Sequence, residues 1–140
     1  MKNNFLLQKF AQKINDPTNV KIILPESNDR VSKASEILND IGINVLQVRD
    51  IENYNIDSLA ILKKLKFAKN WSEEDLIEYA SQPYIKSLLL LKESKIGGVV
   101  CGSDLSSADV IRGGLRIIGL KNSVKNLSSM FLMGSQNGKN

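Results

Sequence analysis

The sequence predicts an α/β protein, in which a mostly parallel sheet lies between helices in a three-layer αβα arrangement. Two observations carry this prediction. Residues 20–24 and 43–48 are short apolar runs, and an amphipathic helical stretch joins them as in a parallel β-α-β unit. A third apolar run at 97–101 is followed by another amphipathic stretch, so the alternation continues along the chain.

The first half of the chain is expected to contain a helix over 5–14, a strand over 20–24, a helix from 28 or 29 to 41 and a strand over 43–48. Pro25 ends the first strand because proline has no N–H to donate to a ladder. Asn28 or Asp29 offers an N-cap for the crossover helix, and Gly42 stands where a left-handed C-cap falls. The apolar face of that helix is made of Val31, Ala34, Leu38 and Ile41.

The middle of the chain is expected to be helical after a polar loop at 50–57. Ser72 and Asp75 have the spacing of a capping box, which predicts a short helix to residue 80. Pro83 suits the first position of the next helix, which runs to residue 92. The leucines with helical spacing after the loop are Leu59, Leu62 and Leu65, and the core residues expected of the later helix are Ile85, Leu88 and Leu89.

The last third is expected to contain a strand over 97–101, a helix ending at Gly119 and a strand over 126–133. The apolar character of 97–101 favours a central place in the sheet. Ser106 and Asp109 form a second capping-box pattern, which begins the helix. Its apolar face is made of Ala108, Ile111, Leu115 and Ile118. We expect one α/β domain over 1–134 and a polar tail over 135–140.

Composition excludes several classes of protein. At 140 residues, with 42% hydrophobic and 24% charged residues, the chain has the size and balance of one globular domain. No apolar run is long enough for a membrane-spanning helix and the start lacks a signal-peptide pattern, so we expect a cytoplasmic protein without a membrane partner. The net charge of +4 is spread among interleaved acidic and basic residues, so nucleic acid is not an expected partner. The chain has no histidine and one cysteine, Cys101, which excludes a zinc site, an internal disulfide and a histidine-based catalytic triad.

The turn after the third expected strand is the strongest candidate site. Gly102 ends the strand, and Ser106 and Ser107 open a helix, an arrangement that directs free backbone N–H groups toward an anion such as phosphate. Ligands of open α/β sheets also bind at the carboxyl ends of the strands. The alternative is that Ser106 only caps its helix and Gly102 only makes a turn.

Arg112 is the candidate cation of this site. Its planar guanidinium matches phosphate or carboxylate, although an exposed ion-pair stripe with Asp109 and Arg116 explains the same spacing. Gly113 and Gly114 inside a helix cost roughly 1–2 kcal/mol relative to alanine, which suggests close approach by a packed neighbour or by a ligand.

Other residues are weaker candidates. Cys101 fits a small core residue better than a nucleophile, since no base is evident near it. Glu26, Asp29 and Arg30 fit a helix start better than the edge of a cleft. The paired Ser128 and Ser129 interrupt an apolar strand, so at least one is expected to point into the interior or a pocket. Trp71 is most simply a packing residue.

Three stretches together resemble the phosphate acetyl/butyryl transferase family. Residues 21–34, from Lys21-Ile22-Ile23-Leu24-Pro25-Glu26 onward, resemble the opening strand and helix of the family. Residues 98–112 are similar to its signature of glycine followed by Ser/Thr-Ala-Asp. Residues 115–119 and 127–133 resemble the stretch that follows. The resemblance covers nearly the whole chain.

The resemblance implies an isocitrate-dehydrogenase-like αβα fold, here incomplete, and a reversible acetyl transfer between coenzyme A and inorganic phosphate. It implies coenzyme A or acetyl-CoA and phosphate or acetyl phosphate as ligands, with no separate cofactor and no metal. Ser106, Ser107 and Arg112 are then expected near the anionic substrates, as are Ser128 and Ser129. Acetyl and butyryl transfer are not distinguished.

The sequence departs from the family at two points. Gly113 stands where the family has proline after the helix arginine. The family's second domain, with the arginine and aspartate that act on the thiol, has no counterpart here. We therefore expect the front part of such a transferase, truncated or encoded in pieces, that needs a companion chain to catalyse. The alternatives are a non-catalytic remnant or a binding module for coenzyme A or phosphorylated ligands, and a homodimer formed through an exposed sheet edge.

Overall fold

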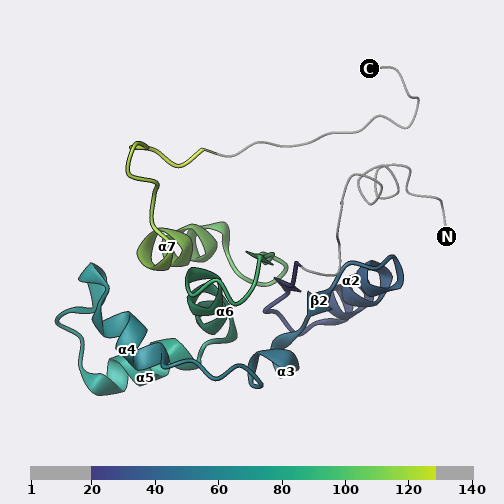
Figure 1. Cartoon of the computed structure of the whole chain (residues 1–140), viewed down its shortest axis with the longest axis horizontal. Coiled ribbons are helices and arrows are strands. Elements are labelled where there is room, and N and C mark those ends of the chain that lie inside the picture. The colour runs from purple at the N-terminus through teal and green to yellow at the C-terminus, as the bar shows by residue number, and fades with distance from the viewer. Residues whose placement is uncertain (1–19, 129–140) are drawn as a thin grey trace. The chain divides into compact units, whose positions relative to one another are not determined.

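A computed structural model describes residues 20–128 of the chain (Figure 1). The described residues 20–119 belong to one compact unit and residues 120–128 to a second. The helices and strands of the first unit are β1 (Ile22–Ile23), α2 (Asp29–Asp40), β2 (Val45–Leu46), α3 (Val48–Ile51), α4 (Ser58–Lys63), the 3-10 helix η1 (Lys66–Ala68), α5 (Glu73–Ser81), α6 (Pro83–Lys92), β3 (Gly98–Val99) and α7 (Ser107–Ile117). The described part of the second unit contains a turn, in which the Val124 N–H donates a hydrogen bond to the Lys121 carbonyl.

The three strands form a parallel sheet in the order β2-β1-β3. Ile22 lies opposite Val45 on one side and opposite Gly98 on the other. With helices packed around it, this sheet confirms the predicted αβα class in a small and incomplete form. The strand expected over 126–133 is not formed at 126–128, and residues 129–133 lie outside the described part, as does the helix expected over 5–14.

The expectation of a central third strand is wrong for the sheet that the structure describes. β1 takes the central place because it bonds on both sides: Leu24 N–H donates to the Leu46 carbonyl, and Val100 N–H donates to the Ile23 carbonyl. β3 therefore lies at an edge, and Val100 is 59% exposed. The apolar run at 97–101 is instead partly covered by the core, on which Val99 and Cys101 pack.

Helix α2 has the cap that its sequence predicts. The Asn28 side chain accepts the N–H of Val31 at 3.0 Å, and Gly42 ends the turn after the helix with φ of +85°. The side of the helix that carries Ser35 is buried, whereas Ala34 and Ile41 are exposed. Only part of the expected apolar face is therefore covered.

Helix α6 is the centre of the core. Its buried residues are Tyr84, Ile85, Ser87, Leu88, Leu89 and Leu90, which confirms the expected core positions. Pro83 is the first residue of the helix, and the reciprocal Ser72–Asp75 capping box begins α5, both as predicted. Around α6 pack Leu62 of α4, Leu76 of α5 and Ile117 of α7.

Two local expectations need correction. Residues 48–51 form the short helix α3 where the end of a strand and the start of a loop were expected, because Asp50 accepts the N–H of Gln47 at 2.7 Å and caps the turn. On α7 the apolar face of Ala108, Ile111, Leu115 and Ile118 is exposed, while Gly113 and Ile117 are buried. The helix turns this way because a tyrosine of α6 packs directly on Gly113.

Candidate functional site

The loops after β1 and β3 lie next to each other because these strands are parallel neighbours. The Glu26 carboxylate, which follows β1, accepts four backbone N–H groups of the loop after β3. Oε2 accepts Gly102 and Ser103 at 2.9 and 3.0 Å, and Oε1 accepts Asp104 and Leu105 at 2.7 and 2.8 Å. Glu26 is only 8% exposed, so the carboxylate is buried within a concave array of amides.

This arrangement corrects the expectation of free amides in the turn. The backbone groups of 102–105 do face one point, as the glycine-rich pattern predicted, but Glu26 occupies that point. Burial alone would raise the pKa of Glu26, and the four N–H donors reverse that effect, so its pKa lies below the ordinary 4.5. The ionised carboxylate is therefore the internal anion of the loop.

Two further residues join the same loops. Asn28 caps α2 with its oxygen and donates its Nδ2 to Ser103 Oγ at 3.1 Å and to Asp104 Oδ2 at 2.8 Å. Arg30 donates to the Ser103 carbonyl at 3.4 Å and makes an exposed ion pair with Asp104 at 4.0 Å. We call Glu26, Asn28 and Arg30, with residues 102–105, the loop interlock. From the sequence, Glu26 and Arg30 are interpreted as part of a helix start. Glu26, however, lies too far before α2 to cap it.

Beyond the interlock, the N-terminus of α7 carries the predicted polar residues. Ser106 Oγ accepts the N–H of Asp109 at 3.2 Å and donates to its carboxylate at 2.6 Å. Arg112 Nη1 donates to the other oxygen of Asp109 at 2.6 Å. The hydrogen bond from Ser106 and the charge of Arg112 together lower the pKa of Asp109. The structure thus brings Ser106, Asp109 and Arg112 onto one exposed face of the helix.

Ser107 stands beside this group as the first residue of α7 and is exposed. In the part of the chain that the structure describes, the N–H groups of Ser107 and Ala108 have no hydrogen-bond acceptor. They point out of the helix end with the positive side of its dipole. The free donors at this end of α7 are therefore those of the helix and not those of the preceding turn.

Gly113 and Gly114 differ in what surrounds them. A Cβ on Gly113 would lie 2.6 Å from Cε1 of Tyr84, so this glycine is explained by a packed neighbour. Gly114 has nothing within 4 Å of the same position. The Tyr84 hydroxyl donates to the Val110 carbonyl at 2.6 Å and fixes the ring against the helix.

The remaining candidates are Cys101, Ser128 and Ser129. Cys101 is half-buried, and burial together with the charge of Glu26 raises the pKa of its thiol, which disfavours the reactive thiolate. Ser128 is exposed in the second unit, and Ser129 lies outside the described residues. Among residues 20–128, no group of three or more Cys, Asp or Glu could hold a metal ion, and no helix is long and apolar enough to cross a membrane.

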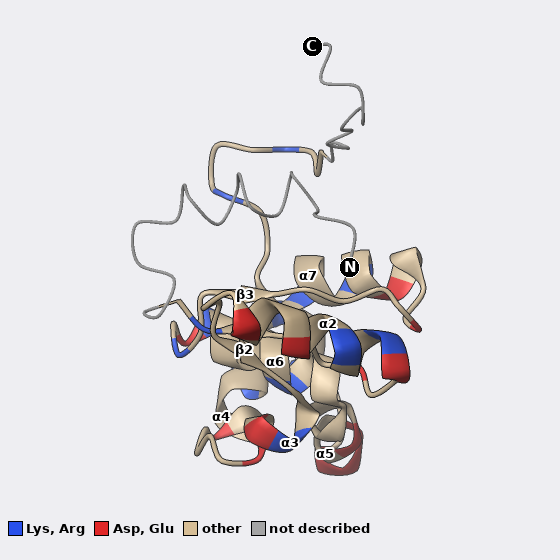
Figure 2. Ribbon diagram, turned by 90° about the vertical axis from the view of Figure 1, so that its right-hand side faces the viewer, with Lys and Arg blue, Asp and Glu red and all other residues tan. Residues whose placement is uncertain are grey.

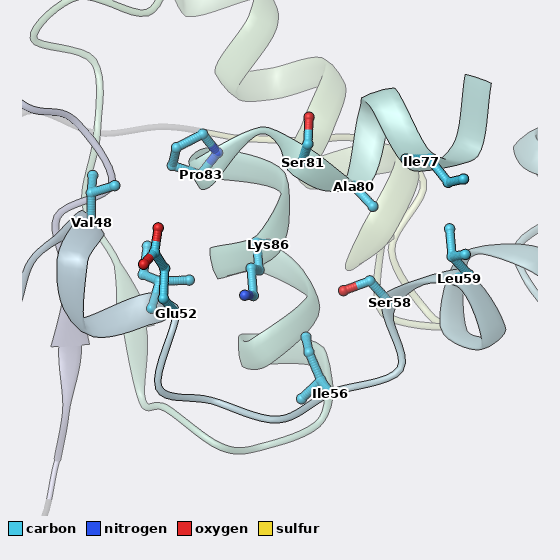
Figure 3. Close-up of a pocket in the computed structure, with 11 residues that line it drawn as sticks. Val48, Glu52, Ile56, Ser58, Leu59, Ile77, Ala80, Ser81, Pro83 and Lys86 are labelled. Atoms are coloured by element: carbon cyan, nitrogen blue, oxygen red, sulfur yellow. The ribbon is translucent and has the colours of Figure 1, made fainter. Parts of the chain in front are cut away.

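Two concavities of the first unit are lined by residues other than Ser106, Ser107 and Arg112. The first, of about 380 Å³, lies among α3, α4, α5 and α6. Figure 3 shows Lys86 in the middle of it, between Glu52 and Ser58, with an otherwise mostly apolar lining. The second, of about 410 Å³, is lined by Trp71, Asp75, Glu78, Tyr79 and Gln82.

Comparison with known proteins places the chain in a family. Residues 6–140 match the family described as phosphate acetyl/butaryl transferase. Over 109 residues, or 78% of the chain, it is 27% identical to phosphate acetyltransferase of Haemophilus influenzae, and it spans 15% of that protein's length. EutD phosphotransacetylase from Staphylococcus aureus has the same fold, with a TM-score of 0.62 and 22% identity over 86% of this chain and 44% of that one. The chain therefore belongs to the phosphate acetyl/butaryl transferase family.

Proposed function

We propose that this chain supplies one wall of an acyl-transfer site that exchanges an acetyl group between coenzyme A and inorganic phosphate. The observation that carries the proposal is the family match over residues 6–140. The chain spans 15% of the length of the curated phosphate acetyltransferase that it matches, so the complete activity belongs to the proposal and not to the family assignment.

The anion-binding face in this proposal is the start of α7. Arg112 supplies a guanidinium that can pair with phosphate oxygens, and Ser107 supplies a hydroxyl and a free N–H at the positive helix end. One oxygen of Asp109 accepts a hydrogen bond from Arg112 at 2.6 Å, and the other accepts one from Ser106. Because Ser106 holds the carboxylate in place, the carboxylate fixes the direction of the guanidinium. Phosphate binding then competes with Asp109 for one edge of Arg112.

The transfer also needs a base for the thiol. The coenzyme A sulfur attacks the carbonyl carbon of acetyl phosphate, the bond from that carbon to the phosphate oxygen breaks, and the thiol proton passes to the base. Asp109 is a poor base because its pKa is lowered, and Glu26 is fully engaged by four amides. We therefore propose that a companion chain supplies the base and closes the site.

The test is formation of acetyl-CoA from acetyl phosphate and coenzyme A, measured on the purified chain with and without candidate companion chains. Turnover that appears only with a companion and falls at least tenfold in Arg112→Ala supports the proposal. Arg49→Ala, which removes the same charge from the exposed side of α3, is the matched control. Equal turnover by the chain alone would refute the need for a companion.

A binding module for coenzyme A or phosphorylated ligands is the second candidate function. The lowered pKa of Asp109 favours it, since a carboxylate held by Ser106 and Arg112 orients a guanidinium without accepting a proton from a thiol. Calorimetric titration with coenzyme A, together with the turnover assay, distinguishes the two functions. A binding module shows saturable binding of coenzyme A and no turnover with any companion chain. Sedimentation of the same sample decides whether two copies associate.

A further inference from the structure

Three aromatic rings pack against one another at the end of the helical layer that contains α5. The ring centroids of Phe67 and Trp71 are 5.3 Å apart, those of Trp71 and Tyr79 are 5.2 Å apart, and those of Phe67 and Tyr79 are 5.8 Å apart. All three pairs are edge-to-face, and the Trp71 and Tyr79 planes meet at 81°. The rings also pack on the core, which holds them in place. We call this group the aromatic corner.

The second concavity opens at the aromatic corner. Two of its walls are Trp71 and Tyr79, whose ring planes are nearly perpendicular to each other. Its other lining residues are polar, and two of them, Asp75 and Glu78, carry negative charge. Figure 2 shows the concentration of acidic residues on α5, which contributes both carboxylates. The cavity therefore combines two aromatic walls with two carboxylates.

One of the two carboxylates is held in place before any ligand binds. Oδ2 of Asp75 accepts the N–H of Ser72 at 3.2 Å and its hydroxyl at 2.6 Å, as part of the capping box of α5. The other oxygen of Asp75 has no partner among the described residues, and neither does the carboxylate of exposed Glu78. Binding a cation here would break no existing ion pair.

The aromatic corner already binds a cation at another of its rings. The guanidinium carbon of Arg116, on α7, lies 5.5 Å from the centroid of Phe67, within the range of a cation–π interaction. Trp71 and Tyr79 can make the same kind of interaction, and indole is the strongest aromatic partner of a cation. The concavity beside them has no cation from the described part of the chain.

We propose that the aromatic corner binds a small organic cation with an alkylated ammonium group. Trp71 and Tyr79 contact the alkyl groups around the positive nitrogen, while Asp75 and Glu78 neutralise its charge. A metal ion suits the cavity poorly, because hard cations require a shell of oxygen ligands and two walls of this cavity are rings. The site is on a different set of residues from the start of α7 and does not depend on the proposed acyl transfer.

Choline is the probe, because its neutral isostere 3,3-dimethyl-1-butanol has the same shape without the charge. Trp71 is the only tryptophan of the chain, so its fluorescence reports directly on the cavity. We expect choline to shift the emission saturably at constant ionic strength, and the isostere to require at least tenfold more ligand. An equal response to both compounds, or no saturable response to choline, would overturn the proposal.

Two variants locate the site, and each leaves Trp71 as the reporter. Glu78→Gln is expected to weaken choline binding roughly threefold to tenfold, and so is Tyr79→Ala. Glu74→Gln is the matched control, since it removes the same charge from the same helix outside the cavity. If Glu74→Gln and Glu78→Gln weaken choline binding equally, the effect comes only from the overall negative charge of α5. That result would reject the site. Because Tyr79 packs on the core, circular dichroism is used to verify that the Tyr79→Ala variant is folded. If Tyr79→Ala unfolds, Glu78→Gln alone decides the outcome.

Discussion

The ring of Tyr84 on α6 occupies the space in which a side chain at residue 113 of α7 would begin. A Cβ on Gly113 would lie 2.6 Å from Cε1, 3.0 Å from the hydroxyl oxygen and 3.1 Å from Cζ of that ring. The hydroxyl group also donates to the Val110 carbonyl, one turn earlier on the same helix. The contact therefore sets how closely α6 and α7 approach and which side of α7 is buried.

Gly113→Ala is expected to destabilise the protein by about 1–3 kcal/mol, because the new methyl group overlaps a ring that is held in place. Gly114→Ala is the matched control, since nothing lies within 4 Å of its Cβ position. Alanine is the better helix former, so we expect this variant to gain about 0.5–1 kcal/mol. Urea unfolding measures both, and equal changes in the two variants would contradict the packing argument.

Glu26→Gln is expected to destabilise the protein by about 2–4 kcal/mol. The substitution replaces one carboxylate oxygen by an NH₂ group, which faces two N–H donors of the loop and leaves them without an acceptor. Glu36→Gln, on the exposed side of α2, removes the same charge and is expected to change stability by less than about 0.5 kcal/mol. Hydrogen exchange provides a local test: the amides of 102–105 should lose protection in Glu26→Gln and keep it in Glu36→Gln.

The stabilisation by Glu26 is expected to depend on pH in the acid range. Its folded-state pKa lies below 4.5, so the unfolded chain takes up this proton first as the pH falls. The contribution is complete above about pH 4.5 and is lost as the pH falls through the lower folded-state pKa. The difference in unfolding free energy between wild type and Glu26→Gln should therefore shrink in acid. A difference that stays constant down to the acid transition would show that the carboxylate charge is not what holds the loop.

Tyr84 is expected to make stability depend on pH in the alkaline range. Burial, with smaller effects from Cys101 and Tyr79, raises the pKa of its hydroxyl from 10.0 to about 12. Between these values the unfolded chain loses the proton and the folded chain keeps it, so stability falls as the pH rises. Tyr84→Phe removes this dependence and, at neutral pH, costs about 0.5–1.5 kcal/mol for the lost hydrogen bond to Val110. Unfolding of both proteins across the alkaline range tests the slope, which should be less steep in the variant.

The features that could be predicted from the sequence are local ones. The caps at Asn28, Ser72 and Ser106 depend on residues three positions apart, and all three are present. The left-handed glycines at 42 and 119 depend on a single residue and its place after a helix, and both have positive φ. The αβα class followed from the order of strand-like and helix-like segments, and the parallel sheet confirms it.

What could not be predicted depends on contacts between distant residues. Glu26 and Gly102 are 76 positions apart, and nothing in either local pattern shows that the carboxylate fills the amide array. Periodicity identified an apolar face on α7 but could not show that Tyr84 would press on the opposite side, at Gly113. The assignment of Ser106, Ser107, Arg112, Ser128 and Ser129 to substrate binding stays a prediction.

Ser107→Asp separates helix stability from anion binding in the proposed site. A carboxylate at the first position of α7 interacts favourably with the helix dipole, so we expect stability to stay within about 0.5 kcal/mol of the wild type or to rise. The same charge lies at the helix end that carries the free N–H groups, where it repels a phosphate, so coenzyme A affinity is expected to fall at least tenfold. Asn53→Asp, in the exposed turn after α3, adds an equal charge and is expected to bind coenzyme A like the wild type. If titration calorimetry gives the two variants the same affinity, the start of α7 does not bind the anion, and Ser106 and Ser107 serve the helix alone.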